Sequence, residues 1–535
     1  MLDFLLAIPE SSGTSAMVAA LQGAECYPHA TTNVEVAETH ISWVFLAGPY
    51  AYKIKKPVNL GFVDFSTLAA RKHYCEEEIR LNRRFVPDLY LDIVEIRGSA
   101  EAPRIAGSGP ILDYAVRMHR FLQDAQADRL LAHGEMTPKL VTDFATYLAE
   151  FHSGLPPLTA DEPCGTPEAV PHNAMQNFQQ IASLLTDAND REALEALRSW
   201  TESEFSAREG EMRQRYAAGM TRECHGDLHL GNILLRNGKL VPFDCIDFSA
   251  ALRWNDVMSE VAFLVMDLMD RGAPRLASLF LSTYLETTGA YSGLSVLRWY
   301  LVYRALVRAK VHVIRARQSE TTAAEALRLV QACRDYMALA KECSHRNRPR
   351  LLLMHGFSAS GKSTVAQELV QACGAIRVRA DVERKRLHGL LALGDSASPV
   401  GSGLYGEAST DATYTRLAKA ARTIVQAGYT AVVDAAFLRR AQRAELGEIG
   451  ATLNVPVALI DVQAPQSLLR ERIARRAQQA TDPSEATVEV VEHQIEIAEA
   501  VTADEGLHVI VVNGCEGVTP ATVVELSRLL CESAD

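Results

Sequence analysis

The pattern of hydrophobic and polar positions changes along the chain. Residues 41–55 (ISWVFLAGPYAYKIK) predict two strands around an Ala-Gly-Pro turn, and residues 66–85 begin with a Ser/Thr cap and continue as a helix. A strand pair followed by a helix indicates a small α+β lobe. From residue 136 onward the pattern becomes mostly helical, with Thr137 as the cap and Pro138 at the first helical position.

The rest of the chain contains two further patterns. A Pro-rich loop occupies residues 155–171, several helices are predicted over 254–345, and a polar hinge (SHRNRPR) lies at 344–350. Beyond the hinge, short apolar segments alternate with helical ones, which is typical of a parallel sheet wrapped by helices. The predicted strands are 350–355, 375–380, 430–435, 455–462 and 507–513.

This change of pattern predicts two domains. The chain has 535 residues, more than the roughly 250–300 at which a single hydrophobic core usually stops growing. We place the boundary at the hinge, which gives an N-terminal domain over residues 1–347 and a C-terminal domain over residues 348–535.

Composition and charge narrow the class of protein. With 48% hydrophobic and 22% charged residues, the chain has the composition of a globular protein, and its net charge of -12 argues against a broad basic face for nucleic acid. Ten cysteines without a C-x-x-C pair are typical of a reducing compartment. The N-terminus lacks a basic region, and the longest apolar runs, such as residues 261–269, are too short to span a membrane. We therefore expect a cytoplasmic enzyme.

The segment HGDLHLGNILL, residues 225–235, is the first candidate for phosphate chemistry. Phosphoryl transfer from ATP needs a carboxylate that orients or deprotonates the acceptor hydroxyl, and oxygen atoms that hold Mg²⁺. Asp227 and Asn232 have the spacing of the protein-kinase catalytic loop H-R-D-L-x-x-x-N. Twelve residues further on, Asp244 can supply a metal-binding carboxylate.

A lysine for the nucleotide phosphates is predicted upstream of this segment. Lys53 lies on a predicted strand in an A-x-K pattern, and the following helix carries Glu77 and Glu78, either of which can be its ion-pair partner. Glu78 is our preferred partner, and Glu77 is the alternative. Lys55 lies on the same face of the strand as Lys53, so the pattern leaves both lysines as candidates.

Over about residues 25–340, these motifs resemble those of the aminoglycoside phosphotransferase family, whose members have a protein-kinase-like fold. The motif G-x-G-x-x-G does not precede the lysine, which leaves ATP and GTP open as nucleotides. The resemblance implies Asp227 as the catalytic base, Asn232 and Asp244 as Mg²⁺ ligands, and Lys53 with Glu78 at the nucleotide.

Two other interpretations of the first site stay open. The segment can belong to a degenerate nucleotide-binding module, or His225, Asp227 and His229 at alternate positions can form a metal-hydrolase site. The metal-hydrolase interpretation lacks further ligands at useful spacing, whereas the kinase-like one also explains Asn232 and Asp244.

A helix over residues 297–317 bears on the acceptor of the first domain. It places Arg304, Arg308 and Arg315 near one face. Aminoglycosides are polycations that call for acidic residues, so an arginine-lined pocket predicts a neutral or acidic acceptor with Arg304 and Arg308 at the substrate. The alternative is a solvated basic face.

The second candidate site is GFSASGKST at residues 356–364, which satisfies the P-loop motif G-x-x-x-x-G-K-[ST]. A predicted strand enters this loop and a helix leaves it, so backbone N–H groups and the helix dipole can point at phosphates. Lys362 is predicted to reach the β- and γ-phosphates, and Ser363 to hold Mg²⁺. The predicted nucleotide-binding residues are Gly356, Ser358, Ala359, Ser360, Gly361, Lys362, Ser363 and Thr364.

The segment after the second predicted strand of this domain carries Asp-x-x-R. Over about residues 350–513 the chain resembles polynucleotide kinases and zeta-toxin-like small kinases, which implies Asp381 as the general base and Arg384 as a clamp on the acceptor or the transferring phosphate. Arginines near a transferring phosphoryl group neutralise its charge. Further candidates are Asp434 for the metal, Arg439 and Arg443 for the substrate, and Arg472 and Arg476 in a lid helix.

Together these features predict a protein-kinase-like α+β domain, with a strand-rich small lobe and a helical lobe, followed by an α/β P-loop domain with a five-stranded parallel sheet. The predicted protein is a bifunctional phosphotransferase that uses ATP and Mg²⁺ to phosphorylate small-molecule hydroxyls. Nucleic acid is a less favoured partner, and no membrane partner is expected. The alternatives make the C-terminal domain a 5′-hydroxyl polynucleotide kinase, or an ATPase switch that regulates the first domain.

Overall fold

The computed structural model describes residues 12–39, 41–59, 63–158, 164–317, 321–346, 348–391, 406–477 and 487–515. The chain divides into two compact units. Unit 1 comprises Met1–Leu140, Leu155–Ala169 and Tyr216–Glu260, and unit 2 comprises Val141–Gly154, Val170–Arg215 and Val261–Asp535. The predicted boundary residue 347 lies outside the described residues, and the division there stays a prediction.

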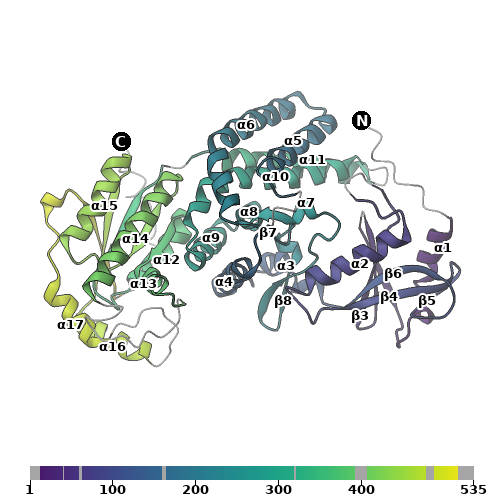
Figure 1. Cartoon of the computed structure of the whole chain (residues 1–535), viewed down its shortest axis with the longest axis horizontal. Helices are drawn as coiled ribbons and strands as arrows, with labels where there is room; N and C mark the ends of the chain where they lie inside the picture. The colour runs from purple at the N-terminus through teal and green to yellow at the C-terminus, as the bar shows by residue number, and fades with distance from the viewer. Residues whose placement is uncertain are drawn as a thin grey trace. The chain divides into compact units, whose positions relative to one another are not determined.

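Unit 1 is built on a six-stranded antiparallel sheet with the order β1-β2-β3-β6-β4-β5 (Figure 1). The predicted strand pair at residues 41–55 is confirmed as β2 and β3, in which Val44 lies opposite Lys53. The strands are β1 (Val34–Glu38), β2 (Ser42–Ala47), β3 (Tyr50–Lys55), β4 (Tyr90–Ser99), β5 (Ala102–Ile105) and β6 (Ile111–His119).

Helix α2 (Leu68–Asn82) follows β3, as the sequence predicts. The side chain of Thr67 accepts a hydrogen bond from the amide of Ala70 and so caps the helix. This cap fixes where the helix begins, and therefore which of its residues face the sheet. Glu78 is one of the buried positions of α2.

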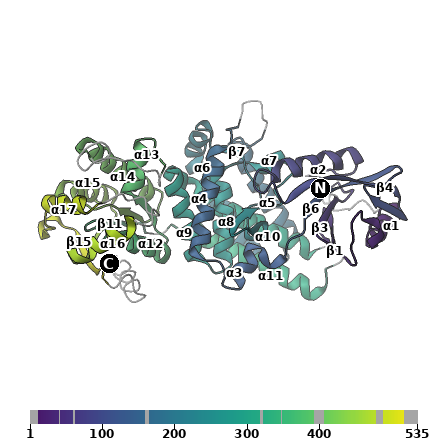
Figure 2. The same cartoon turned by 90° about the horizontal axis from the view of Figure 1, so that it is seen from below.

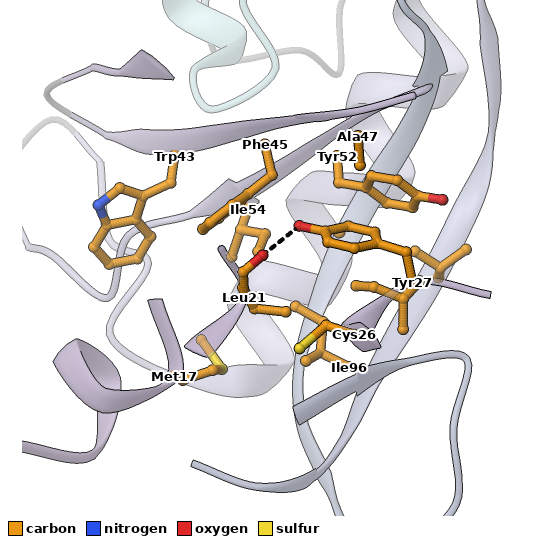
Figure 3. Packing of buried hydrophobic residues seen from close by; sticks show 13 residues of the cluster. Met17, Leu21, Cys26, Tyr27, Trp43, Phe45, Ala47, Tyr52, Ile54 and Ile96 are labelled. Atoms are coloured by element: carbon orange, nitrogen blue, oxygen red, sulfur yellow. Dashed lines mark hydrogen bonds between the residues drawn. The ribbon is translucent and has the colours of Figure 1, made fainter. Parts of the chain in front are cut away.

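A hydrophobic core of the small lobe forms where α1 (Ser12–Ala20) and the turn after it contact the sheet. Figure 3 shows Leu21 and Tyr27 packed against Tyr52 and Ile54. The Tyr27 hydroxyl donates a hydrogen bond of 2.7 Å to the carbonyl of Leu21, so the buried phenol keeps a polar partner. This core supports the strand that carries both candidate lysines.

The remainder of unit 1 consists of short elements around the segment 225–247. A two-stranded antiparallel pair, β8 with β9, follows the catalytic-loop motif directly. These elements are η3 (Gln123–Ala125), α3 (Ala127–Ala132), β7 (Thr221–Glu223), η4 (Leu230–Asn232), β8 (Ile233–Arg236), β9 (Lys239–Pro242), α7 (Ala250–Arg253) and β10 (Trp254–Asp256).

Long helices form the first part of unit 2 and confirm the predicted helical lobe. Trp299, fully buried on α10, donates a hydrogen bond of 3.1 Å from its indole to the carbonyl of Thr201. Across the described ranges, none of the helices combines the length and the apolar character needed to cross a membrane. The helices are α4 (Pro138–Gly154), α5 (Ala169–Leu184), α6 (Ala188–Ala217), α8 (Val257–Asp270), α9 (Pro274–Thr288), α10 (Leu294–Ala316) and α11 (Ala323–Ser344); a few terminal residues of α4, α5, α6 and α8 belong to unit 1.

The second part of unit 2 is a five-stranded parallel sheet with the order β12-β13-β11-β14-β15, which confirms the predicted sheet. Helices lie on both of its faces (Figure 2). The strands are β11 (Leu351–His355), β12 (Ile376–Arg379), β13 (Ala431–Asp434), β14 (Val457–Gln463) and β15 (His508–Asn513), and the helices are α12 (Lys362–Cys373), α13 (Ala380–Leu387), α14 (Glu407–Gln426), α15 (Arg440–Leu453), α16 (Gln466–Ala477) and α17 (Val488–Ile497).

The order of these strands brings the candidate residues of the P-loop domain to one edge. The carboxyl ends of parallel strands meet at the same edge of a sheet, which is where ligands bind in open α/β folds. The P-loop follows β11, Asp381 follows β12, and Asp434 ends β13. The adjacent positions of Met354, Asp434 and Arg379 in the register confirm that these ends lie side by side.

The core beneath this edge allows a test of the sheet. Ile460 on β14 is fully buried among residues of α12 and the neighbouring strands, whereas Val509 on β15 is 41% exposed. We expect Ile460→Ala to destabilise the sheet by about 2–5 kcal/mol because it leaves a cavity. Val509→Ala, the matched control, should cost less than about 1 kcal/mol. Amide hydrogen exchange of β11 and β14 measures both; equal effects would contradict the placement of Ile460.

Candidate functional sites

Two lysines of β3 share one carboxylate of α2 in the first site. Glu78 Oε1 lies 2.8 Å from Lys53 Nζ, and Glu78 Oε2 lies 2.9 Å from Lys55 Nζ. Glu77 instead pairs with Arg80 at 2.8 Å and Arg253 at 3.1 Å. This geometry favours Glu78 over Glu77 as the ion-pair partner and shows that both lysines lie on one face of the strand.

The two lysines differ in their second partner. Lys53 Nζ lies 2.5 Å from Asp244 Oδ1, and the Asp244 side chain is 46% exposed. Lys55 pairs with Asp247, and both of these side chains are buried. The pair of Lys53 with Asp244 is therefore the more exposed of the two, which favours Lys53 over Lys55 at the nucleotide; this role stays a prediction.

Charge coupling keeps this cluster ionised. Burial by itself would raise the pKa of Glu78, but Lys53 and Lys55 outweigh it and lower the pKa to about 2. Burial likewise disfavours the charged form of Lys53, but Asp244 and Glu78 outweigh it and raise its pKa above the usual range. At neutral pH the first site therefore holds a fixed carboxylate and a fixed ammonium group.

The backbone around Asp244 is held in an uncommon conformation. Asp244 has φ 60°, in the left-handed region that residues other than glycine rarely adopt. The hydroxyl of Tyr90 accepts a hydrogen bond of 3.0 Å from the Asp244 amide, and Asn82 Oδ1 accepts one of 2.9 Å from Cys245. Strain of this kind persists where its surroundings fix it, which is common at functional sites.

The catalytic-loop motif places Asp227 beside Asn232. The Asn232 amide nitrogen donates to Asp227 Oδ2 at 3.1 Å and to the Asp227 carbonyl at 3.0 Å. The amide of Phe243, the residue before Asp244, donates to the Asn232 carbonyl at 3.0 Å. Hydrogen bonds therefore link the candidate base Asp227 to Asn232, and Asn232 to the backbone of the residue before Asp244.

Glu260 and His225 hold this loop from inside the molecule. The buried Glu260 carboxylate accepts hydrogen bonds from the amides of His225 at 3.1 Å and Gly226 at 2.8 Å. His225 Nε2 lies 2.8 Å from the carbonyl of Phe243, and its Nδ1 accepts from the Asp227 amide at 3.3 Å. Burial lowers the pKa of His225, so the ring is neutral. Because backbone groups engage both ring nitrogens, the metal-hydrolase interpretation is disfavoured.

The donor set at this site fits Mg²⁺. The metal prefers oxygen ligands, and it commonly takes one or two carboxylates together with the phosphates of a substrate. Asn232 uses its amide nitrogen toward Asp227, which leaves its amide oxygen for a cation, and Asp244 presents an accessible carboxylate. The roles of Asn232 and Asp244 as metal ligands are supported by this arrangement and stay predictions.

Three arginines of α10, Arg304, Arg308 and Arg315, contact aromatic rings or a carboxylate. Arg304 is buried, with its guanidinium over the rings of Phe263 and Tyr303. Arg308 lies over the ring of Tyr336, and Arg315 pairs with Glu325 at 2.8 Å. Packing against aromatic faces stabilises a buried guanidinium, so these contacts favour a structural role for Arg304 over the predicted role at the substrate.

The P-loop joins β11 to α12 with the backbone that its glycines permit. Gly356 has φ 125°, and a Cβ there would lie 2.5 Å from the carbonyl of Val462. Gly361 has φ 106° and precedes the first residue of α12, Lys362. The helix therefore begins with its amides at the loop, the arrangement that binds phosphate. Lys362 Nζ donates to the carbonyl of Phe357 at 2.7 Å.

Two buried oxygens near the loop fit a nucleotide and a metal. Among the described residues, neither Ser360 Oγ nor Asp434 Oδ2 has a hydrogen-bond partner. A buried polar atom without a partner is costly, and unfilled ligand positions are a common reason for one. The pair fits the predicted roles of Ser360 at the nucleotide and Asp434 at the metal.

Asp381 lies in the first turn of α13, and Arg384 lies in its last turn. Arg384 Nη1 donates to Asp381 Oδ1 at 3.2 Å. The Asp381 side chain is 30% exposed, whereas that of Arg384 is 13% exposed. The pair occupies the carboxyl end of β12, where a carboxylate can reach an acceptor hydroxyl, and both roles stay predictions.

Helix α16, the predicted lid, and helix α17 contact the P-loop through polar side chains. Arg472 of α16 donates to the carbonyls of Ala359 at 3.2 Å, Ser360 at 3.0 Å and Gly514 at 2.7 Å. Gln494 of α17 accepts from the Ser358 amide at 2.8 Å and donates to its hydroxyl at 3.0 Å. Arg472 therefore holds the loop backbone. Arg476 belongs to α16, but its side chain lies outside the described residues.

Arg443 is enclosed by an ion pair and by backbone carbonyls. Its side chain is 0% exposed and pairs with Glu505 at 2.7 Å. The same guanidinium donates to the carbonyls of Phe437, Leu438, Glu499 and Ala500. These contacts favour a structural role for Arg443 over the predicted one. Arg439 is more exposed and pairs with Glu407 at 3.5 Å.

Several residues that shape the two sites carry no motif of their own. Glu260, Tyr90 and Asn82 act through backbone groups of the catalytic segment, and their partners lie far away in the sequence. Gln494 reaches the P-loop from 136 positions away. Asp247 had a local signal, because it follows Asp244 by three residues in the same segment.

Two protein-family models match separate segments of the chain, one for each candidate site. Residues 72–300 match the model described as phosphotransferase enzyme family, and residues 351–501 match the model described as AAA domain. The first match includes α2 and the segment 225–247 but begins after Lys53. Each model matches less than half of the chain, so the chain is similar to the phosphotransferase enzyme family over the first segment and to the AAA domain over the second.

Individual relatives have been found in mycobacteria and among solved structures. An uncharacterized protein of Mycobacterium tuberculosis (strain ATCC 25618 / H37Rv) is 28% identical over 468 residues, which cover 87% of this chain and 91% of that protein. Amicoumacin kinase hAmiN, solved with AMP-PNP, Ca²⁺ and Ami, is 12% identical, with a TM-score of 0.40 over 62% of this chain and 94% of that one. A sugar kinase from Janibacter sp. HTCC2649 is 19% identical, with a TM-score of 0.27 over 35% of this chain and 96% of that one. Both TM-scores are low, and neither similarity bears on fold or function.

The charge network of the first site predicts a pH-dependent effect of Glu78→Gln. At pH 7 the variant should lose about 3–5 kcal/mol of stability, because two buried lysines lose their shared carboxylate. A carboxyl whose pKa is lowered on folding stabilises above its unfolded value of 4.5, and this contribution is lost as pH falls toward about 2. The gap between wild type and variant should therefore narrow below about pH 4.5.

Urea unfolding at pH 7 and at about pH 3.5 measures this gap. Glu76→Gln is the matched control, because Glu76 lies on the same helix with its side chain 53% exposed. It should change the unfolding free energy by less than about 0.5 kcal/mol. A gap for Glu78→Gln that stays constant with pH would contradict the assigned network.

Proposed function

We propose that the chain is an ATP- and Mg²⁺-dependent phosphotransferase with two sites, each of which moves the γ-phosphate of ATP to the hydroxyl of a small molecule. The observation that carries this proposal is a linked set of five residues that holds together a cation, two candidate metal ligands and a candidate base: Lys53, Glu78, Asp244, Asn232 and Asp227. The predicted cytoplasmic location is part of the proposal.

In the first site, each of these residues has a defined task. Asp227 orients the acceptor hydroxyl and takes its proton as the hydroxyl oxygen bonds to the γ-phosphorus and ADP leaves with the bridging oxygen. Asn232 holds the carboxylate in place. Lys53, fixed by Glu78, neutralises charge on the nucleotide phosphates. Asn232 and Asp244 are the residues that would hold the metal, which would supply charge neutralisation at the nucleotide phosphates. Catalysis of this kind rests on positioning and electrostatics.

In the second site, the amides of the P-loop and Lys362 bind the phosphates. Ser363 and Asp434 are the residues that would hold the metal. Asp381 is the candidate base for the acceptor hydroxyl, and Arg384 orients it or contacts the transferring phosphate. A kinase needs this second carboxylate, whereas an ATPase switch does not, so Asp381 beside Arg384 favours the kinase.

The basic residues of the P-loop domain bear on its acceptor. Nucleic-acid binding needs cationic groups that are free to meet phosphates. Arg440 pairs with Asp504 at 2.6 Å, Arg386 pairs with Glu383, and Arg443 is buried. These ion pairs favour a small acceptor over a 5′-hydroxyl polynucleotide. The predicted preference of the first domain against aminoglycosides loses the support of Arg304 and stays a prediction.

Two substitutions test the proposal of separate sites. Asp227→Asn should lower one phosphoryl transfer by about 10²–10⁴-fold, because the general base is lost. Lys362→Ala should remove a second transfer, because the phosphates lose their cation. Transfer from γ-labelled ATP into a pool of metabolites, aminoglycosides and oligonucleotides measures both, and each variant should spare the product lost in the other.

Glu195→Gln and Lys419→Ala are the matched controls, because these exposed side chains lie on α6 and α14, which carry none of the predicted site residues. Both should retain the two transfers of the wild type. Loss of both products in Asp227→Asn would show that the second site needs the first. A wild-type chain that labels none of the acceptors would reject the function for these classes of molecule.

A further inference from the structure

Strand β12 forms an edge of the parallel sheet, and its outer side is covered by α9 and the turn after it. Ser282 of α9 accepts a hydrogen bond of 3.0 Å from the Arg377 amide, and the Tyr291 hydroxyl donates to the Arg377 carbonyl at 3.5 Å. Figures 1 and 2 both show α9 beside α12. An edge strand exposes backbone groups that need cover, and here side chains of the helical lobe provide it.

Glu286 of α9 lies between two arginines of this strand. Its Oε2 accepts a hydrogen bond of 2.9 Å from Arg377 Nε, and its Oε1 lies 3.8 Å from Arg379 Nη1. Residues two apart on a strand point to the same side, which explains why one carboxylate contacts both. The three side chains are only 11–12% exposed, so solvent screens their charges weakly.

The same arginines reach the predicted metal ligands of the P-loop site. Arg379 Nε lies 3.7 Å from Asp434 Oδ2, the buried oxygen described above. Arg377 Nη1 donates to the backbone carbonyl of Ser363 at 3.5 Å. One arginine therefore separates Glu286 from each of the two residues that would hold the metal.

A second contact fixes the helix that carries the candidate base. Arg386 of α13 donates to the carbonyls of Glu286 and Thr287, at 3.2 Å to the latter, and so caps the end of α9. A Cβ on Gly289 would lie 2.9 Å from the Arg386 guanidinium carbon. The Arg386 side chain could shift to make room, but Gly289 also has φ 70°, a conformation that favours glycine.

We propose that Glu286 is a positioning residue of the P-loop site, supplied by the helical lobe; this inference rests on the proposed function of that site. Glu286 shares Arg379 with Asp434, so the arginine does not neutralise the metal carboxylate fully. Without Glu286, two arginine charges remain near the metal position, and Arg379 turns to Asp434 alone. Positive charge at that place opposes the binding of Mg²⁺.

The test is the Mg²⁺ dependence of ADP binding to the full chain, measured by calorimetry. Glu286→Gln should raise the Mg²⁺ concentration for half-maximal binding at the P-loop site about tenfold, the lower end for residues that support metal ligands. Glu286→Asp keeps the charge, so it should raise this Mg²⁺ concentration by less than Glu286→Gln does. Arg275→Gln is the matched control: it removes the 3.0 Å pair with Glu368 between α9 and α12 and should leave the dependence unchanged.

A double substitution separates positioning from mere packing. If Arg379 competes for Asp434, then Glu286→Gln combined with Arg379→Gln should need less Mg²⁺ than Glu286→Gln alone. If the role of Glu286 is purely structural, the double variant should need more Mg²⁺ than Glu286→Gln alone. This comparison also keeps the proposal testable if Glu286→Gln lowers stability, because the Glu286→Asp and Arg379→Gln variants provide their own Mg²⁺ dependences.

Lys362→Ala, measured in parallel, defines the binding that belongs to the P-loop site. If this variant binds ADP as the wild type does, the proposed function of that site fails. If Lys362→Ala loses binding while Glu286→Gln keeps the wild-type Mg²⁺ dependence, the role of Glu286 alone is overturned.

Discussion

The first site depends on one buried carboxylate shared by two lysines. Glu78 contacts both Lys53 and Lys55. Each lysine also pairs with an aspartate: Lys53 with Asp244, and Lys55 with Asp247. Buried charges are tolerated only when they are paired with good geometry. The network therefore couples the strand β3, the helix α2 and the loop after β9, and a shift in any one of them leaves a buried charge without its partner.

The need to pair buried charges also explains why the two lysines differ in their surroundings. The pair built on Asp247 is buried and neutral in sum, so it anchors the strand to the loop. The pair built on Asp244 opens toward solvent and can meet the charge of a nucleotide. One face of β3 thus carries both the buried ion pair that anchors the site and the exposed one that can contact a ligand.

Local patterns predicted much of the architecture. The Ala-Gly-Pro turn, the Thr67 cap and the alternating strands and helices after the hinge all concern neighbours in sequence, and each is present. The surroundings of Arg304 and Arg443 could not be predicted, because an exposed and a buried arginine on a helix have the same local sequence pattern. Arg304 packs on Phe263, and Arg443 pairs with Glu505. Glu260, Gln494 and Glu286 act across long sequence separations, for which one sequence holds no signal.

The cover over β12 has a consequence for how the chain is made. Ser282, Glu286 and Tyr291 leave the ribosome before Arg377 does, so the helical lobe can already be formed when the edge strand of the P-loop sheet is synthesised. The sheet then grows against a finished surface and has no period with that edge open. A chain that starts at the hinge would lack this surface. Its edge strand β12 would then be exposed and could pair with strands of other chains, which leads to aggregation.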